Sequence, residues 1–194
     1  MTNVRRKNGG RFPPGMSLRD SRKRPNPTED NQRDEIMNAQ DEWIEAAARV
    51  AKRLHDGQKD KAGMDYFEGH LSLVASLGNT WQEKVVGYLH DASEDTPHDV
   101  EQVLDLLEEE AQAVMEPSDK EEIAQALQLL NHHLAGDRKT YIRSIGGHSL
   151  ARAVKLNDLT HNMDIQRLPC PTEKDYQRLA RYRQEYEYLS QIKR

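Results

Sequence analysis

Two carboxylates follow a His-Asp doublet at a spacing that suits metal-assisted hydrolysis. The doublet is His90-Asp91, the carboxylates are Glu94 and Asp95, and a further histidine, His70, lies upstream. If this segment is helical, residues four apart share a face, so each member of the doublet lies beside one carboxylate. Imidazole and carboxylate groups bind divalent ions that activate water and neutralise phosphoryl charge. The segment therefore predicts a metal site with adjacent proton carriers.

A second polar group interrupts an apolar helical pattern over residues 154–163. It contains Asp158 and Asn162, which are four residues apart. On one helix face these side chains would offer a carboxylate to an ion and an amide to the molecule that the ion binds. The alternative is a solvated polar stripe without chemistry. The same segment contains His161, which we leave out of the predicted ligand set.

Taken together, these motifs resemble the HD-domain hydrolases of the RelA/SpoT type, which include small alarmone hydrolases. The resemblance covers about residues 40–168, and the motifs occur in the family's order. The residues that carry it are His55-Asp-Gly-Gln-Lys-Asp-Lys-Ala-Gly63, Tyr66, His70, His90-Asp91 with Glu94-Asp95-Thr96, and Lys155-Leu-Asn-Asp158 with Asn162.

The resemblance implies a mostly helical domain that binds one divalent ion. The positions that match the family's metal ligands are His70, His90, Asp91 and Asp158. Two imidazoles and two carboxylates suit Mn²⁺ or a similar first-row ion, and zinc is the less expected alternative. Glu94 and Asp95 match the acidic pair that orients and deprotonates the attacking water.

The resemblance also implies a reaction, the removal of pyrophosphate from the ribose 3′ position of guanosine tetra- or pentaphosphate. Asn162 matches a position that contacts the nucleotide. The chain departs from the family at Asp60-Lys61, where many members have Arg-Lys and use the arginine to stack on guanine. One extra residue also separates Tyr66 from His70. Lys61 can supply a positive charge to a phosphate, or it can be an ordinary exposed lysine.

Three hypotheses about function follow from this comparison. The first is an enzyme, a metal-dependent hydrolase of (p)ppGpp-type alarmones. The second is a phosphatase or pyrophosphatase that acts on another small nucleotide, such as an adenosine alarmone or a dinucleotide cofactor. The third is a non-catalytic HD regulatory module.

The elements that must position these residues read as helices, so the expected fold is an all-α HD-domain helical bundle. Apolar spacing predicts helices over residues 33–55, 70–77, 80–91, 119–134 and 173–192. Another is expected after Pro97, facing inward through Val100, Val103, Leu104 and Leu107, with its Glu108-Glu109-Glu110 run in solvent. Thr80 is a plausible cap. We assign His132 and His133 no chemistry and expect them at the surface. The tyrosine-leucine stripe of the last helix predicts core packing, and the alternative is a dimer contact, which would make the protein a homo-oligomer.

Charge divides the chain into a predicted tail, residues 1–30, and a domain, residues 31–194. The net charge is −5, but the tail contains eight Lys/Arg and three acidic residues. Its proline, glycine and near lack of apolar residues predict disorder. A basic tail can contact nucleic acid through phosphates. Because the tail lacks spaced aromatic residues, a solvated linker is the preferred interpretation.

Length and composition predict one domain in the cytoplasm. The chain has 194 residues, within the usual size of a domain. No apolar run is long enough for a membrane span, and no hydrophobic segment follows the basic N-terminus. The single cysteine, Cys170, cannot form an internal disulfide, which is compatible with a reducing compartment.

Overall fold

The computed structural model describes residues 27–192, and this part of the chain is helical without a β-strand. The prediction of an all-α fold is confirmed. The tail prediction lies outside the described residues as far as residue 26. Residues 27–30, which the sequence assigned to the tail, instead form the start of helix α1 (Pro27–Leu54). Proline suits the first position of a helix because its fixed φ is already helical and its missing N–H is not needed there.

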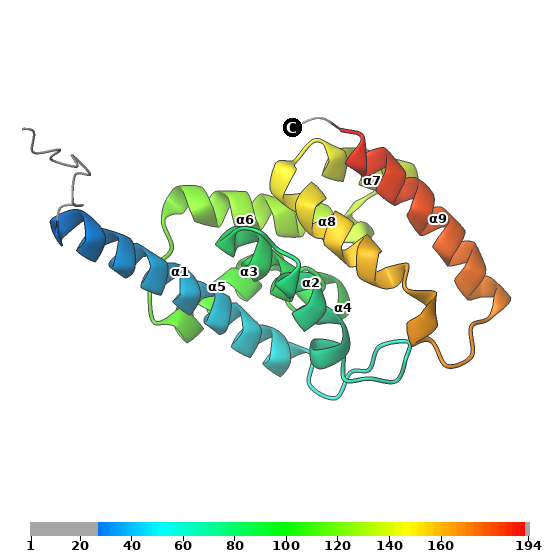
Figure 1. Cartoon of the computed structure of the whole chain (residues 1–194), viewed down its shortest axis with the longest axis horizontal. Coiled ribbons are helices and arrows are strands. Elements are labelled where there is room, and N and C mark those ends of the chain that lie inside the picture. Colours follow the sequence, from blue (N-terminus) through cyan, green and yellow to red (C-terminus); the bar gives the residue numbers. More distant parts are fainter. Residues whose placement is uncertain (1–26, 193–194) are drawn as a thin grey trace, which may run out of the picture.

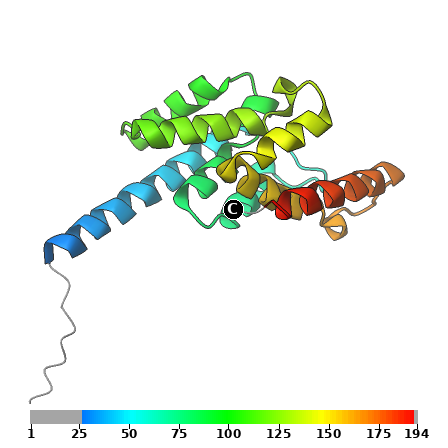
Figure 2. The same ribbon diagram turned by 90° about the horizontal axis from the view of Figure 1, so that it is seen from above.

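Helix α1 extends beyond the other helices at its N-terminal end (Figures 1 and 2). Ile36, which the apolar pattern placed on the buried face, is 56% exposed for this reason, and Met37 is exposed as well. The second half of α1 packs against α3 (Trp81–Leu89) and α5 (Val100–Ala111). There Ala46, Ala47 and Val50 are fully buried. Among the α1 residues whose burial is described, those that belong to the core therefore lie in the C-terminal half of the helix.

The centre of the domain is built around α3 and α8 (Ser149–Asn162). Helix α3 contacts α1, α2 (Ser72–Ser76), α6 (Pro117–Leu130) and α8. Gly87 of α3 allows α2 to approach closely, because a Cβ atom at this position would lie 2.7 Å from the Cα of Ala75. This close crossing brings the end of α3 next to the segment that contains His70.

Several local predictions are confirmed by the helix ends. Thr80 caps α3, and its hydroxyl oxygen accepts a hydrogen bond from the backbone N–H of Glu83 at 3.1 Å. Helix α5 buries Val100, Val103, Leu104 and Leu107. The acidic run at its end does more than face solvent, because Glu108 accepts a hydrogen bond from Lys120 and Glu110 accepts from Arg49 and Arg53.

The last helix, α9 (Glu173–Ser190), packs on α8 and on α7 (Arg138–Gly146). It buries Leu179 and Leu189, as the apolar stripe predicts. The prediction of core packing is wrong for Tyr176 and Tyr186, which are exposed. A carboxylate, Glu185, is buried instead. Among the described residues, no helix is long and apolar enough to cross a membrane.

Candidate metal centre

Four side chains that the sequence places in three separate segments converge at one buried point. His70 lies in a π-helical turn, η1 (Phe67–Leu71), Asp158 lies on α8, and the His90-Asp91 doublet joins α3 to α4 (Ala92–Asp95). The Oδ2 atom of Asp91 is 3.0 Å from His90 Nε2 and 3.4 Å from His70 Nε2. The Oδ1 atom of Asp158 is 3.4 Å from His70 Nε2 and 4.0 Å from His90 Nε2. Ligand atoms about 2.1 Å from one ion and at right angles to each other lie about 3 Å apart.

A helix break at the doublet makes this convergence possible. The helix expected over residues 80–91 ends at Leu89, with His90 as its C-cap, and Asp91 caps the separate short helix α4. Adjacent side chains on a regular α-helix point about 100° apart and cannot share an ion easily. The predicted turn does form after the break, because the Asp95 N–H donates to the Asp91 carbonyl at 2.8 Å.

The π-helical turn can accommodate the extra residue that the resemblance implies between Tyr66 and His70. A π-turn contains one more residue than an α-turn, so it absorbs an insertion and rotates the following side chains. His70 thereby reaches the centre and is 4% exposed. Gly69 is required in this turn, because a Cβ atom there would lie 2.8 Å from the Cβ of Met64.

The two imidazoles are oriented as metal ligands. His90 Nδ1 donates to the carbonyl oxygen of Gly87 at 2.9 Å, which leaves Nε2 buried without a hydrogen-bond partner. His70 Nδ1 lies 2.6 Å from Nδ1 of His161. Burial, the nearby His70 and Arg167 lower the pKa of His161 to about 4, so a neutral His161 can accept the Nδ1 proton of His70. Hydrogen bonds of this kind fix the ligand tautomer in metal sites.

The two carboxylates are also held in place. Tyr66 Oη donates to Asp91 Oδ2 at 2.7 Å, and Lys155 Nζ donates to Asp158 Oδ2 at 2.8 Å. Asn162 Nδ2 donates to Asp158 Oδ1, so this side chain orients a candidate ligand as well as lining the cavity around it. Each carboxylate therefore has one candidate ligand oxygen and a partner that fixes its direction.

Charge balance keeps both carboxylates ionised. Burial by itself would raise their pKa values, but His90 and His70 hold the pKa of Asp91 well below its usual range. Lys155 and the same imidazoles lower the pKa of Asp158. Burial opposes the charged form of His90, yet the two carboxylates raise its pKa to about 9. The buried His70, His90 and Asp158 could hold a metal ion, and their ligand atoms lie within 4.8 Å of one another.

The centre opens into a cavity of about 410 Å³ whose lining is rich in cations. Lys61, predicted to bind substrate, is exposed and lines this cavity. Asp60, where the resemblance would place an arginine, accepts a hydrogen bond from Arg167 at 2.8 Å. Four further cavity-lining cations lie outside the recognised motifs at scattered positions, so no local pattern in the sequence points to them: Arg138, Arg167, Arg178 and Arg181.

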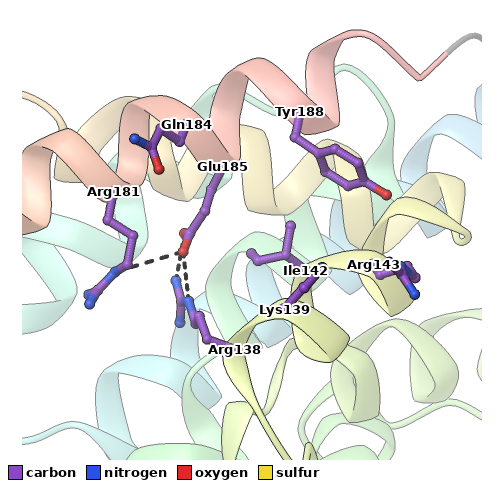
Figure 3. A pocket seen from close by; sticks show the side chains of 8 residues that line it. All are labelled: Arg138, Lys139, Ile142, Arg143, Arg181, Gln184, Glu185 and Tyr188. Atoms are coloured by element: carbon purple, nitrogen blue, oxygen red, sulfur yellow. Dashed lines mark hydrogen bonds and ion pairs between the residues drawn. The ribbon is translucent and has the colours of Figure 1, made fainter.

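A second cavity, of about 390 Å³, lies between α7 and α9 and shares Arg138 and Arg181 with the first (Figure 3). The buried Glu185 fixes both arginines. It accepts from Arg138 through two hydrogen bonds of 2.8 and 2.7 Å, and its Oε1 lies 3.7 Å from Arg181 Nε. Arginine at the junction of the two cavities can bind phosphate through its planar fork of N–H donors.

The predicted acidic pair divides into two different environments. Both carboxylate oxygens of Glu94 contact His132. The backbone N–H of His132 donates to Oε2 at 3.0 Å, and its ring Nδ1 lies 2.6 Å from Oε1. Asp95 is only partly covered by its neighbours and lines the cavity. Partial burial and the charges of Asp91 and Glu94 raise the pKa of Asp95. The two carboxylates are therefore not equivalent.

Neither a protein-family model nor a curated protein matches this chain. The functional assignment consequently depends on the geometry and chemistry of the site.

Proposed function

We propose that the protein is a metal-dependent hydrolase of small nucleotides, of the HD-domain RelA/SpoT type, that removes a 3′-pyrophosphate from (p)ppGpp-type alarmones. The observation that carries this proposal is the buried convergence of His70, His90, Asp91 and Asp158 with one unpartnered Nε2 atom beneath a cationic cavity. Buried charges require a partner or an ion, and the six Lys and Arg side chains that line the cavity beside five carboxylates can contact a substrate with several phosphates.

Mn²⁺ is the proposed ion, and the four converging side chains would hold it. When bound, it would lower the pKa of water and neutralise charge on phosphoryl oxygens. Mixed imidazole and carboxylate ligands suit Mn²⁺ better than zinc, which favours sites richer in Cys and His.

The chain's own residues bind the substrate and accept the proton. Lys61, Arg178 and Arg181 line the cavity where they can neutralise the phosphates. Asp95 takes a proton from the attacking water, and its raised pKa makes it a better base near neutral pH than an ordinary aspartate. As the water oxygen bonds to phosphorus, the bond from phosphorus to the ribose 3′ oxygen breaks.

Hydrolysis of another nucleotide is the second candidate. One observation favours it: residue 60 is an aspartate that is paired with Arg167, so this position cannot supply a guanidinium to a guanine base. An adenosine alarmone or a dinucleotide cofactor would fit the same phosphate chemistry.

The test is pyrophosphate release by metal-stripped protein with and without added Mn²⁺. Guanosine tetraphosphate and its adenosine counterpart are compared as substrates. Asp91→Asn retains shape but removes the ligand charge, and Asp105→Asn on the exposed face of α5 is the matched control. We expect Mn²⁺-dependent release from the guanosine substrate that only the Asp91 change abolishes. Release from the adenosine substrate alone would establish the second candidate, and release from neither by Mn²⁺-loaded protein would contradict alarmone hydrolysis.

A further inference from the structure

His132 and Glu94 form a dyad at the edge of the cavity that contains the candidate metal centre. Both oxygens of Glu94 contact His132, one through the backbone N–H at 3.0 Å and one 2.6 Å from the ring Nδ1. His132 lies in η2 (His132–Leu134), which follows α6, and Glu94 lies in α4, so the contact joins residues 38 positions apart. This arrangement fixes the ring by both its main chain and its side chain.

The carboxylate that accepts a hydrogen bond from Nδ1 of His132 determines which ring nitrogen is left for a reacting group. The Nδ1–H donates to Glu94, so Nε2 is the atom left for a reacting group. His132 lines the same cavity as His70, Asp91 and Asp158, and its side chain is 45% exposed. The Nε2 atom of His132 can therefore contact a ligand in the cavity directly, because the side chain is not enclosed by other groups.

We infer that His132 is the general acid of the reaction, oriented by Glu94. This inference rests on the proposed function. In the step, the water oxygen bonds to phosphorus and loses its proton to Asp95, while the bond between phosphorus and the ribose 3′ oxygen breaks. The leaving oxygen takes the proton from Nε2 of the imidazolium. The ring is left neutral with its Nδ1–H still on Glu94, and solvent restores the proton.

The chemistry of the leaving group explains why this acid is needed. A ribose alkoxide is a strong base and leaves poorly without a proton, whereas the arginines of the cavity can neutralise phosphoryl oxygens but do not give up a proton. General acid catalysis of this kind typically contributes about 10²–10⁴-fold in rate. Glu94 stabilises the charged ring in the way that a buried carboxylate orients a catalytic histidine.

Other groups around the ring do not compete for this role. The ring of His133 lies tilted against that of His132 with ring centres 4.1 Å apart, but His133 does not line the cavity. The ring of Tyr141 on α7 lies edge-on to that of His132 with ring centres 6.4 Å apart, and its hydroxyl donates to the carbonyl of Leu130. Arg138 and Lys155 lie over the Tyr141 ring, 5.0 and 5.4 Å from its centre.

The test compares His132→Gln with the matched neighbour His133→Gln in the full, Mn²⁺-loaded protein. We expect kcat for 3′-pyrophosphate release to fall by about 10²-fold or more for His132→Gln with little change in KM, and to stay near wild type for His133→Gln. The pH profile of kcat should lose its basic limb only in His132→Gln. Glu94→Gln, which retains the shape of the contact, should give a smaller loss.

A retained basic limb in His132→Gln, or equal losses in both histidine variants, would overturn the inference. Equal losses together with a second bound Mn²⁺ that both variants abolish would assign Glu94, His132 and His133 to an ion, since their ligand atoms also lie within 4.8 Å of one another. If the wild-type protein releases no pyrophosphate, the proposed function fails first. Wild-type activity that His132→Gln retains in full rejects this inference alone.

Discussion

At the scale of single residues, the candidate metal site depends on the groups that hydrogen-bond to its candidate ligands. His90 is held by a backbone carbonyl, His70 by His161, Asp91 by Tyr66 and Asp158 by Lys155. Such partners fix ring tautomers and carboxylate directions before an ion binds, which reduces the conformational entropy lost on binding. The most informative of them is His161, because it lies in a recognised motif but was left out of the predicted ligand set.

Replacing His161 should weaken metal binding without removing a ligand. His161→Phe keeps a planar aromatic ring at this position and leaves His70 Nδ1 without its acceptor, so the His70 ring can rotate or adopt the other tautomer. We expect the Kd for Mn²⁺ to rise about 10–100-fold, measured by isothermal titration calorimetry. His133→Gln should leave the Kd unchanged. An unaltered Kd in the His161 variant would show that His70 is oriented by packing alone.

At the scale of the elements, the site depends on two close contacts between helices. The crossing of α2 and α3 sets the separation of His70 and His90, and the packing of α9 on α7 places the arginines at the cavity. Neither contact includes a candidate metal ligand.

Adding one methyl group at the first contact should disturb the centre. Gly87→Ala places a Cβ atom 2.7 Å from the Ala75 backbone, so the helices must separate. We expect a loss of about 1–3 kcal/mol in the free energy of unfolding, together with weaker Mn²⁺ binding. Chemical denaturation measures the first and calorimetry the second. Gly136→Ala, where the Cβ atom meets open space, is the control and should stay within about 0.5 kcal/mol of wild type.

Removing the buried carboxylate at the second contact should affect substrate binding more than metal binding. Glu185→Gln weakens the pairing with Arg138, whose side chain is about one third exposed. We expect a loss of roughly 1–3 kcal/mol in stability and a KM several-fold higher, with the Kd for Mn²⁺ unchanged. Glu187→Gln, on the exposed side of α9, should change neither quantity. A normal KM in the Glu185 variant would place the phosphates elsewhere in the cavity.

At the scale of the whole molecule, a bound ion and protons would compete for the same centre. In the metal-free protein the pKa of His90 is raised to about 9, above the ordinary value of 6.5. A group with a raised folded pKa contributes stability that is complete below the unfolded pKa and is lost as pH rises through the folded value. The metal-free protein should therefore lose stability as pH rises from about 6.5 to about 9.

Added Mn²⁺ should reverse this loss of stability with rising pH, because the ion would bind the neutral imidazole and so displace the proton. The rise in Tm caused by excess Mn²⁺ is expected to grow between pH 6 and pH 8, since stabilisation follows the ratio of free ion to Kd. Thermal unfolding with and without Mn²⁺ at several pH values measures this difference. A larger rise at pH 6 than at pH 8 would contradict binding at His90.

The amino-acid sequence alone determined the helices and the donor types of the candidate centre. Apolar spacing and the Thr80 cap are local signals, and each reports on a few neighbouring residues. Helix breaks were harder to predict, because the π-helical turn at Phe67–Leu71 and the break at His90-Asp91 arise where packing rotates side chains toward the centre. The exposed Tyr176 and Tyr186 show the same limit, since spacing defines a face but not what covers it.

Only the tertiary structure decided which polar residues meet. Glu94 and His132 are 38 positions apart, and His70 and His161 are 91 apart. Asp60 and Arg167 are separated by 107 positions. Hydrogen bonds over such separations leave no periodic signal in a single sequence, because the partners are brought together by helix packing. In the sequence, each partner has the same local pattern as an ordinary exposed polar residue. The chain thus specifies its candidate ligands locally, and the fold selects the groups that orient them.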